Sequence, residues 1–134
     1  MALTIAERDR EGIRILDLAG RLTVGEAVSC LRERLNDSVA GGQNQVILNL
    51  GEVDYIDSTG LGSLVVCYTR LRRAGGALKL LNLNRRNIEL LVLTKLTTVF
   101  EIFNDEQDAV NSFFPDRKIK RFDILSFIQS QSED

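Results

Sequence analysis

The sequence of 134 residues contains no histidine, one proline and two cysteines. Without histidine, it lacks the commonest general base near neutral pH, the commonest zinc ligand, and every Ser-His or Cys-His nucleophile. Cys30 and Cys67 are far apart, form no C-x-x-C pair and fall inside predicted helices, so we interpret them as reduced core thiols. We therefore expect a protein that is not an enzyme and that uses no metal ion or cofactor.

Long apolar runs and an excess of positive charge are also absent. No run approaches the roughly 20 apolar residues that span a bilayer, and residues 1–4 lack the basic and then apolar order of a signal peptide. The formal net charge of −2 gives no electrostatic reason to expect nucleic acid or an anionic membrane as a partner. We expect a cytoplasmic protein, without direct membrane insertion, whose partner is another protein.

The composition is that of one globular domain, with 44% hydrophobic and 27% charged residues. Pro115, the only proline, is predicted to end the globular part. We therefore expect a single domain over residues 1–114 and a C-terminal extension over residues 115–134. Apolar residues recur every three positions in the extension and predict an amphipathic helix with a disordered end; they are Ile119, Phe122, Leu125 and Ile128.

Predicted strands and helices alternate along the chain. Hydrophobic periodicity and turn residues predict strands over residues 3–7, 13–19, 46–50, 77–83 and 99–103. The helical pattern covers residues 25–40, 58–73, 85–93 and 105–114. Asp105 is the expected N-cap of the last helix. This order indicates an α/β layer sandwich, with helices packed on a mixed or mostly parallel sheet of about five strands.

The segment after the apolar strand 46–50 carries the clearest functional signal. Residues 51–57 are predicted as a link, after which a helix begins near Ser58. The hydroxyl of Ser58 is placed to cap that helix, because it can accept a hydrogen bond from a backbone N–H one turn further on. Strand ends that lead into helices are also where α/β proteins carry functional residues.

Two glycines, Gly60 and Gly62, follow close to the start of this predicted helix. Each costs roughly 1 kcal/mol relative to alanine inside a helix, so capping alone does not explain them. Either the helix start packs closely on the sheet, or an exposed flat surface is kept for the backbone of a second protein. The two explanations are compatible.

Residues 55–62, YIDSTGLG, resemble the signature of the STAS family, the sulphate-transporter and anti-sigma-factor-antagonist domains. Supporting segments outside the motif are residues 13–22, residues 46–50 and Gly75-Gly76. The resemblance covers residues 3–114, a length typical of one domain. It implies a STAS-type layer sandwich with about five strands and four helices, to which the C-terminal extension would add a further helix.

The resemblance also implies a function. Antagonists of this family bind an anti-sigma factor that is itself a serine kinase with a histidine-kinase-like ATPase fold, and so free the sigma factor. The kinase would phosphorylate Ser58, directly after the motif aspartate, and thereby end the contact; a metal-dependent serine phosphatase would reverse this step. Asp57 would orient Ser58. The implied partner-binding residues are Asp57, Ser58, Thr59, Gly60, Leu61 and Gly62.

Other roles stay open at this point. STAS proteins also serve as constitutive accessory subunits of lipid-transporting ATP-binding-cassette systems and as scaffold parts of stress-signalling assemblies. A phosphate loop is disfavoured because no lysine follows Gly62 at the Walker spacing, and a Mg²⁺ receiver site at Asp57 would have only Asp17 as a companion. The C-terminal extension could dock a partner, pair two copies into a homodimer, or cover the domain's own core, and we favour the last. Exposed arginines can be solvated or can meet an acidic partner; they are Arg70, Arg72, Arg73, Arg85 and Arg86.

Overall fold

A five-stranded mixed sheet forms the middle of the structure, a computed structural model that describes residues 3–119 and residue 124. In their order across the sheet, the strands are β1 (Thr4–Arg10), β2 (Ile13–Leu22), β3 (Gln45–Ile56), β4 (Ala77–Leu81) and β5 (Ile102–Phe103). β1 and β2 are antiparallel, and the other neighbouring pairs are parallel. The helices are α1 (Glu26–Ala40), α2 (Ser58–Arg73), α3 (Arg85–Leu93) and α4 (Glu106–Asn111), with a 3-10 turn, η1 (Leu96–Thr98), after α3. The predicted α/β sandwich is confirmed.

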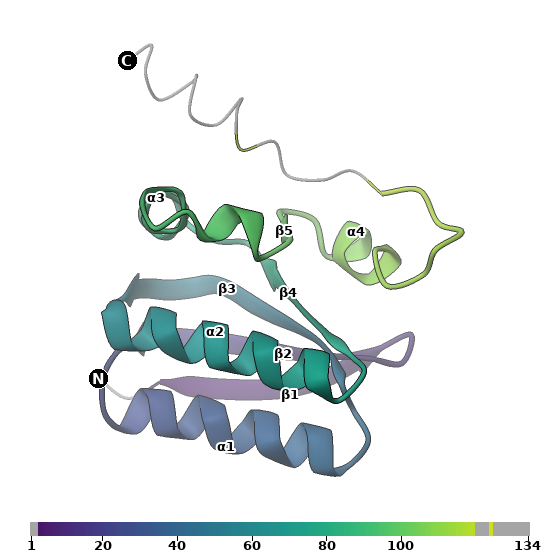
Figure 1. Ribbon diagram of the computed structural model, residues 1–134, viewed down its shortest axis with the longest axis horizontal. Helices are drawn as coiled ribbons and strands as arrows, with labels where there is room; N and C mark the ends of the chain where they lie inside the picture. The colour runs from purple at the N-terminus through teal and green to yellow at the C-terminus, as the bar shows by residue number, and fades with distance from the viewer. Residues whose placement is uncertain (1–2, 120–123, 125–134) are drawn as a thin grey trace.

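Helices cover both faces of the sheet, and each face has its own core. In Figure 1, α1 and α2 lie side by side against one face of the sheet. Successive strand residues point to opposite faces, so Leu16 and Leu18 of β2 enter the core under α1, α2 and α3. Ile13 and Ile15 of the same strand enter the core under α4. Burial on both faces explains the continuous apolar run of residues 46–50.

β3 is longer than predicted, and the predicted link over residues 51–57 is wrong. The strand continues to Ile56, which lies opposite Leu22 of β2. Val53 and Ile56 are buried, so this second half of the strand also has a core face. In the sequence, Gly51 and the acidic residues near it make this segment look like a link and not like a strand with a core face. The longer strand delivers the chain to the start of α2 without a loop.

Several other boundaries differ from the prediction, and β1 and β2 end later than predicted, at Arg10 and Leu22 rather than at residues 7 and 19. β4 ends at Leu81 rather than at residue 83, and the next residue, Asn82, adopts a left-handed φ of 61°. β5 has two residues instead of residues 99–103, because η1 and the turn after it occupy the chain before Ile102. α4 ends at Asn111 rather than residue 114, and its predicted N-cap is confirmed, since Asp105 accepts a hydrogen bond from the N–H of Asp108 at 3.0 Å.

The C-terminal extension touches both cores. Ile119 packs against the core under α4, and Ile124 packs against the core under α1, α2 and α3. Both contacts agree with an extension that covers the domain's own core. Phe122, Leu125 and Ile128 lie outside the described residues, so the amphipathic helix and the domain boundary after residue 114 stay predictions.

Ion pairs tie the β1–β2 hairpin to α4. Arg8 donates through Nε to Asp17 Oδ2 at 2.7 Å and through Nη1 to Glu106 Oε2 at 3.0 Å, and Arg10 also donates to Glu106. The bonds from Arg8 first, and then from Arg10, lower the pKa of Glu106 to about 2. Asp17 accepts a further hydrogen bond from Asn49 of β3 at 2.8 Å. Asp17 is therefore part of a structural network that joins β1, β2 and β3.

Replacing Glu106 with glutamine should lower the free energy of unfolding at pH 7 by about 1 kcal/mol, because two arginines lose a charged acceptor at a partly exposed site. The folded pKa of Glu106 lies below that of the unfolded chain. The advantage of wild type is therefore complete above about pH 4.3 and is lost as the pH falls towards the folded value. Urea unfolding between pH 7 and pH 3 measures it, with Glu33→Gln on the exposed side of α1 as control. A Glu106→Gln protein as stable as wild type at pH 7 would contradict this assignment.

Candidate functional site

The turn from β3 into α2 is organised by Asp57. Its carboxylate accepts hydrogen bonds from the N–H of Gly60 at 2.7 Å and from the N–H of Val24 at 2.9 Å. Its own N–H donates to the carbonyl oxygen of Leu22 at 3.2 Å. Asp57 therefore caps α2 and also holds the loop between β2 and α1. These bonds, that from Gly60 first, lower the pKa of Asp57 because they favour the charged carboxylate.

This cap corrects the prediction that Ser58 is the capping residue. Ser58 is instead the first residue of α2, and it is exposed. Aspartate and serine are both good caps and are adjacent here, so local sequence alone does not decide between them. Among the described residues, the Ser58 hydroxyl forms no hydrogen bond. The cap at Asp57 thus leaves this hydroxyl available at the surface.

The two glycines of the motif have different roles. A Cβ atom at Gly60 would lie 2.0 Å from the carbonyl oxygen of Leu22, so the helix start approaches β2 too closely for any side chain. At Gly62 a Cβ atom would meet nothing within 4 Å, and this position faces solvent. Close packing on the sheet therefore explains Gly60, whereas Gly62 leaves a bare patch on the exposed side of α2.

The structure brings the predicted site residues together at one end of the sheet, but only some reach the surface. The exposed members are Ser58, Thr59 and Gly62. Asp57 is half-buried, and Gly60 and Leu61 are buried. A partner could touch the exposed members directly, while the buried members hold the helix start in place.

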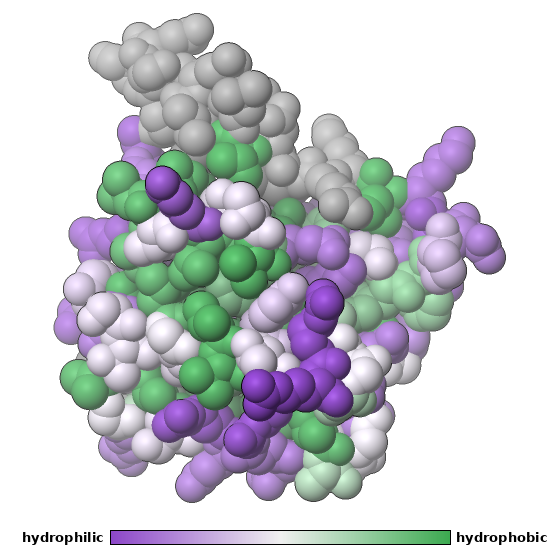
Figure 2. Space-filling model, in the orientation of Figure 1, coloured by the Kyte–Doolittle hydropathy of each residue, from purple (hydrophilic) through white to green (hydrophobic). Residues whose placement is uncertain are grey.

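A groove beside Ser58, between the start of α2 and α3, was not predicted from the sequence. This α2–α3 groove has a volume of about 370 Å³, and its lining includes Tyr55, Ser58, Arg86, Asn87, Leu90 and Leu93. Figure 2 shows hydrophobic side chains gathered on the face that carries α2 and α3. The side-chain amides of Asn84 and Asn87 fix α3 there, since both donate to the carbonyl oxygen of Val53, at 3.1 and 3.0 Å. The sequence does contain a signal that could have indicated this groove. Positions 90–93 are four consecutive apolar residues, which is more than a helix needs to bury one face.

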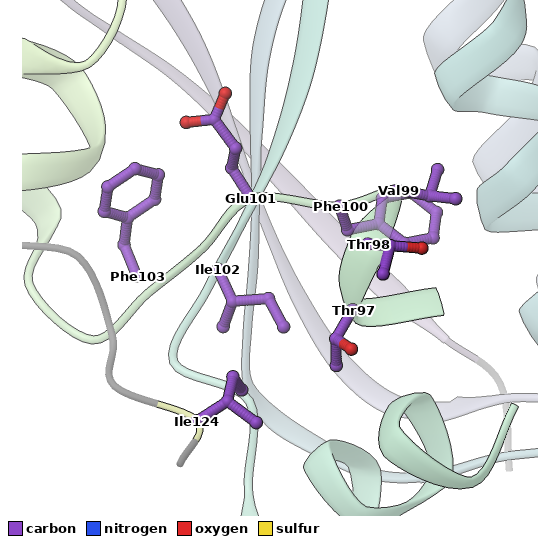
Figure 3. A pocket seen from close by; sticks show the side chains of 8 residues that line it. All are labelled: Thr97, Thr98, Val99, Phe100, Glu101, Ile102, Phe103 and Ile124. Carbon is purple, nitrogen blue, oxygen red and sulfur yellow. The ribbon is translucent and has the colours of Figure 1, made fainter. Parts of the chain in front are cut away.

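A second cavity, of about 240 Å³, lies along η1 and β5. Figure 3 shows Ile102 of β5 and Ile124 of the C-terminal extension pointing toward one another in it. No residue of the motif lines this cavity. Its lining reflects how the extension packs at the edge of the sheet, so we do not take it as the functional site.

The chemistry available at the start of α2 is narrow. Within residues 3–119 and residue 124, no group of three or more cysteines or acids is placed to hold a metal ion. The helices of that part of the chain also include none long and apolar enough to cross a membrane. The site offers two exposed hydroxyls, of Ser58 and Thr59, at the positive end of a helix dipole, a position that accommodates an attached phosphate.

Comparisons of sequence and of structure with known proteins point to the same family. The model of the STAS domain matches residues 4–109. The anti-sigma-B factor antagonist of Bacillus subtilis strain 168 is 34% identical over 110 residues, which cover 82% of this chain and 99% of that protein. The relatives are named as regulatory antagonists and not as enzymes, in line with the expected lack of catalysis.

Solved structures of such antagonists share the fold. An anti-sigma factor antagonist from Mycobacterium paratuberculosis gives a TM-score of 0.70 at 20% identity, over 82% of this chain and 92% of that one. SpoIIAA of Bacillus gives TM-scores of 0.63 unphosphorylated and 0.64 phosphorylated, both at 19% identity, over 84% and 82% of this chain and 99% of each SpoIIAA chain. The resemblance first seen in residues 55–62 is confirmed.

Gly60→Ala should lower the free energy of unfolding by about 3 kcal/mol, because the new Cβ atom would overlap the backbone of β2. Gly62→Ala should be neutral or should stabilise the protein by up to about 1 kcal/mol, because alanine is the better helix former and the space is open. Urea unfolding of the two variants at pH 7 makes the comparison. Equal destabilisation by both substitutions would mean that α2 does not sit on β2 as described.

Proposed function

The chain belongs to the STAS domain family, and we propose that it is an anti-sigma factor antagonist whose partner is released when Ser58 is phosphorylated. The unphosphorylated protein would bind the anti-sigma factor and so free the sigma factor. The observation that carries this proposal is the exposed Ser58 hydroxyl, which the cap at Asp57 leaves unused among the described residues. Similarity to the Bacillus subtilis antagonist, and to a fold known in phosphorylated form, supports it.

The proposed partner is a serine kinase anti-sigma factor with a histidine-kinase-like ATPase fold. It would contact the exposed residues Ser58, Thr59 and Gly62, and the bare backbone at Gly62 would let it approach closely. Asp57 would orient Ser58 by fixing the first turn of α2. A metal-dependent serine phosphatase would restore the free hydroxyl, and the whole exchange would take place in the cytoplasm.

A phosphate on Ser58 would be tolerated by the fold but not by the partner. The first bond along α2 runs from the N–H of Leu61 to the carbonyl of Asp57, so the N–H groups of Ser58 and Thr59 precede the helical ladder. A phosphate adds a charge of about −1.5 to −2, which these groups and the helix dipole favour. The same charge beside Asp57, in the middle of a docking surface, would meet repulsion and a desolvation cost. Binding would therefore switch without refolding.

Ser58→Asp should fold normally and should bind the anti-sigma kinase at least about 100-fold more weakly than wild type, a loss of roughly 3 kcal/mol from an unpaired charge at the interface. Ser58→Ala should keep its binding under conditions in which the kinase is active. Affinity capture from the native host, with partners identified by mass spectrometry, makes the first comparison. Calorimetry with the captured protein then gives the dissociation constants.

Thr69→Asp is the matched control, since it adds the same charge to the exposed side of α2 about three turns further along. We expect that wild type and Thr69→Asp recover a kinase-like ATPase and that Ser58→Asp does not. If wild type and Ser58→Asp instead recover the same transporter subunits or scaffold proteins, the chain has a constitutive role and the phosphorylation switch is wrong.

A further inference from the structure

A further hollow lies on the outer side of α2, in the half of the helix that is remote from Ser58. It has a volume of about 310 Å³, and Val66, Arg70 and Arg73 are part of its lining. A smaller hollow between α1 and α2 adjoins it, because Val66 and Arg70 line both, and Arg32 of α1 lines the smaller one. We call the following residues together the basic patch: Arg32, Val65, Val66, Thr69, Arg70 and Arg73.

The basic patch includes apolar surface. Val66 is 42% exposed, and Val65 next to it is half-buried. In Figure 2, hydrophobic side chains lie among hydrophilic ones over the part of the face where Figure 1 places α2. An exposed apolar side chain that borders a hollow is typical of a site where another protein docks.

The charges of the basic patch all have the same sign. Its cations are Arg32, Arg70 and Arg73, and among the described residues no acid lines either hollow. The residues of α2 include no aspartate or glutamate. Glu33 and Asp37 are the acids of α1 that follow Arg32, and they line neither hollow. A partner would therefore meet positive charge and apolar surface together.

The three arginines also lack the carboxylate partner that other arginines of the chain have. Within residues 3–119 and residue 124 none of them forms an ion pair, and Arg70 donates instead to Asn36 Oδ1. The arginines with an ion pair are Arg8, Arg10, Arg14, Arg34, Arg85 and Arg117.

The dipole of α2 explains only part of this cluster. It favours Arg70 and Arg73, which are in the last turn of the helix, but Arg32 is in the middle of α1, where no such effect acts. Arg70 and Arg73 are also three residues apart on one helix, a spacing at which like charges repel. Carboxylates from outside would relieve this repulsion, so the patch is complementary to an acidic partner.

We propose that the basic patch binds an acidic segment of a second protein, in which glutamates or aspartates flank an aliphatic side chain. The carboxylates would pair with Arg32, Arg70 and Arg73, and the aliphatic side chain would cover Val66. Nucleic acid fits the patch less well, because none of the lining residues is aromatic and could stack on a base. This contact is separate from the one proposed at Ser58.

The basic patch is remote enough from Ser58 to act in both states of the proposed switch. Arg70 and Arg73 follow Ser58 on α2 by about three and four turns, or roughly 18 and 22 Å along the helix axis. The Debye length at physiological ionic strength is about 8 Å, so a phosphate on Ser58 would change the potential at these arginines little. An acidic partner would therefore stay bound while the partner at Ser58 is released.

The acidic peptide acetyl-EELLEE-amide serves as the probe, with acetyl-QQLLQQ-amide as its neutral counterpart. Titrated into the full-length ¹⁵N-labelled protein at low ionic strength, the acidic peptide should shift the amide signals of residues 32–36 and 65–73, with a dissociation constant on the order of a millimolar. Arg32→Gln and Arg73→Gln should each weaken binding about threefold, because each removes one exposed ion pair. Arg86→Gln removes the same charge from α3, lines neither hollow and should leave binding unchanged.

Two other variants test the remaining parts of the proposal. Ser58→Asp should bind the acidic peptide as wild type does, because its charge lies beyond the screening distance. Val66→Ser should weaken binding about twofold without loss of fold, because the side chain is exposed.

Several outcomes would overturn the proposal. They are shifts that stay absent at about ten times the expected dissociation constant, equal binding of the neutral peptide, and equal losses in the Arg73→Gln and Arg86→Gln proteins. Tighter binding of pentauridylate, an RNA probe with the same negative charge, would assign the patch to nucleic acid instead. The titration needs no native partner, so it can fail while the Ser58 switch stands, and the reverse.

Discussion

The functional end of this protein depends on the carboxylate of Asp57. One oxygen accepts from the first turn of α2 and the other from the loop between β2 and α1, so a single side chain joins two segments that are remote in sequence. Because a carboxylate accepts both bonds better than a hydroxyl would, the aspartate caps the helix and the serine next to it does not. The helix start is thereby fixed, and the Ser58 hydroxyl takes no part in holding it.

The position of α2 is fixed a second time, by the approach of Gly60 to Leu22. The carbonyl of Leu22 also accepts the N–H of Asp57, so the end of β2 receives both the capping residue and the bare backbone of the first helical turn. This double contact explains why β2 and β3 run further than the other strands. β2 and β3 extend beyond the other strands of the sheet, so the motif at the end of β3 lies at the surface.

The sequence predicted the order of strands and helices and the segment that carries the site. It did not predict that β3 extends to Ile56, because Gly51 and nearby acids look like a link until the pairing with β2 is known. It also assigned the cap to Ser58, because the bond from Val24 that favours Asp57 is not local. The α2–α3 groove was missed for the same reason: α3 is placed by hydrogen bonds from Asn84 and Asn87 to β3, and these follow from tertiary packing, not from helical periodicity.

The arrangement of charges explains how one modification could affect binding without affecting folding. Asp57 already uses the N–H of Gly60, so a phosphate on Ser58 would find the remaining N–H groups of the first turn and a second anion beside it. Phosphorylation would therefore weaken the contact with the partner, while the largely apolar core under α2 would not change.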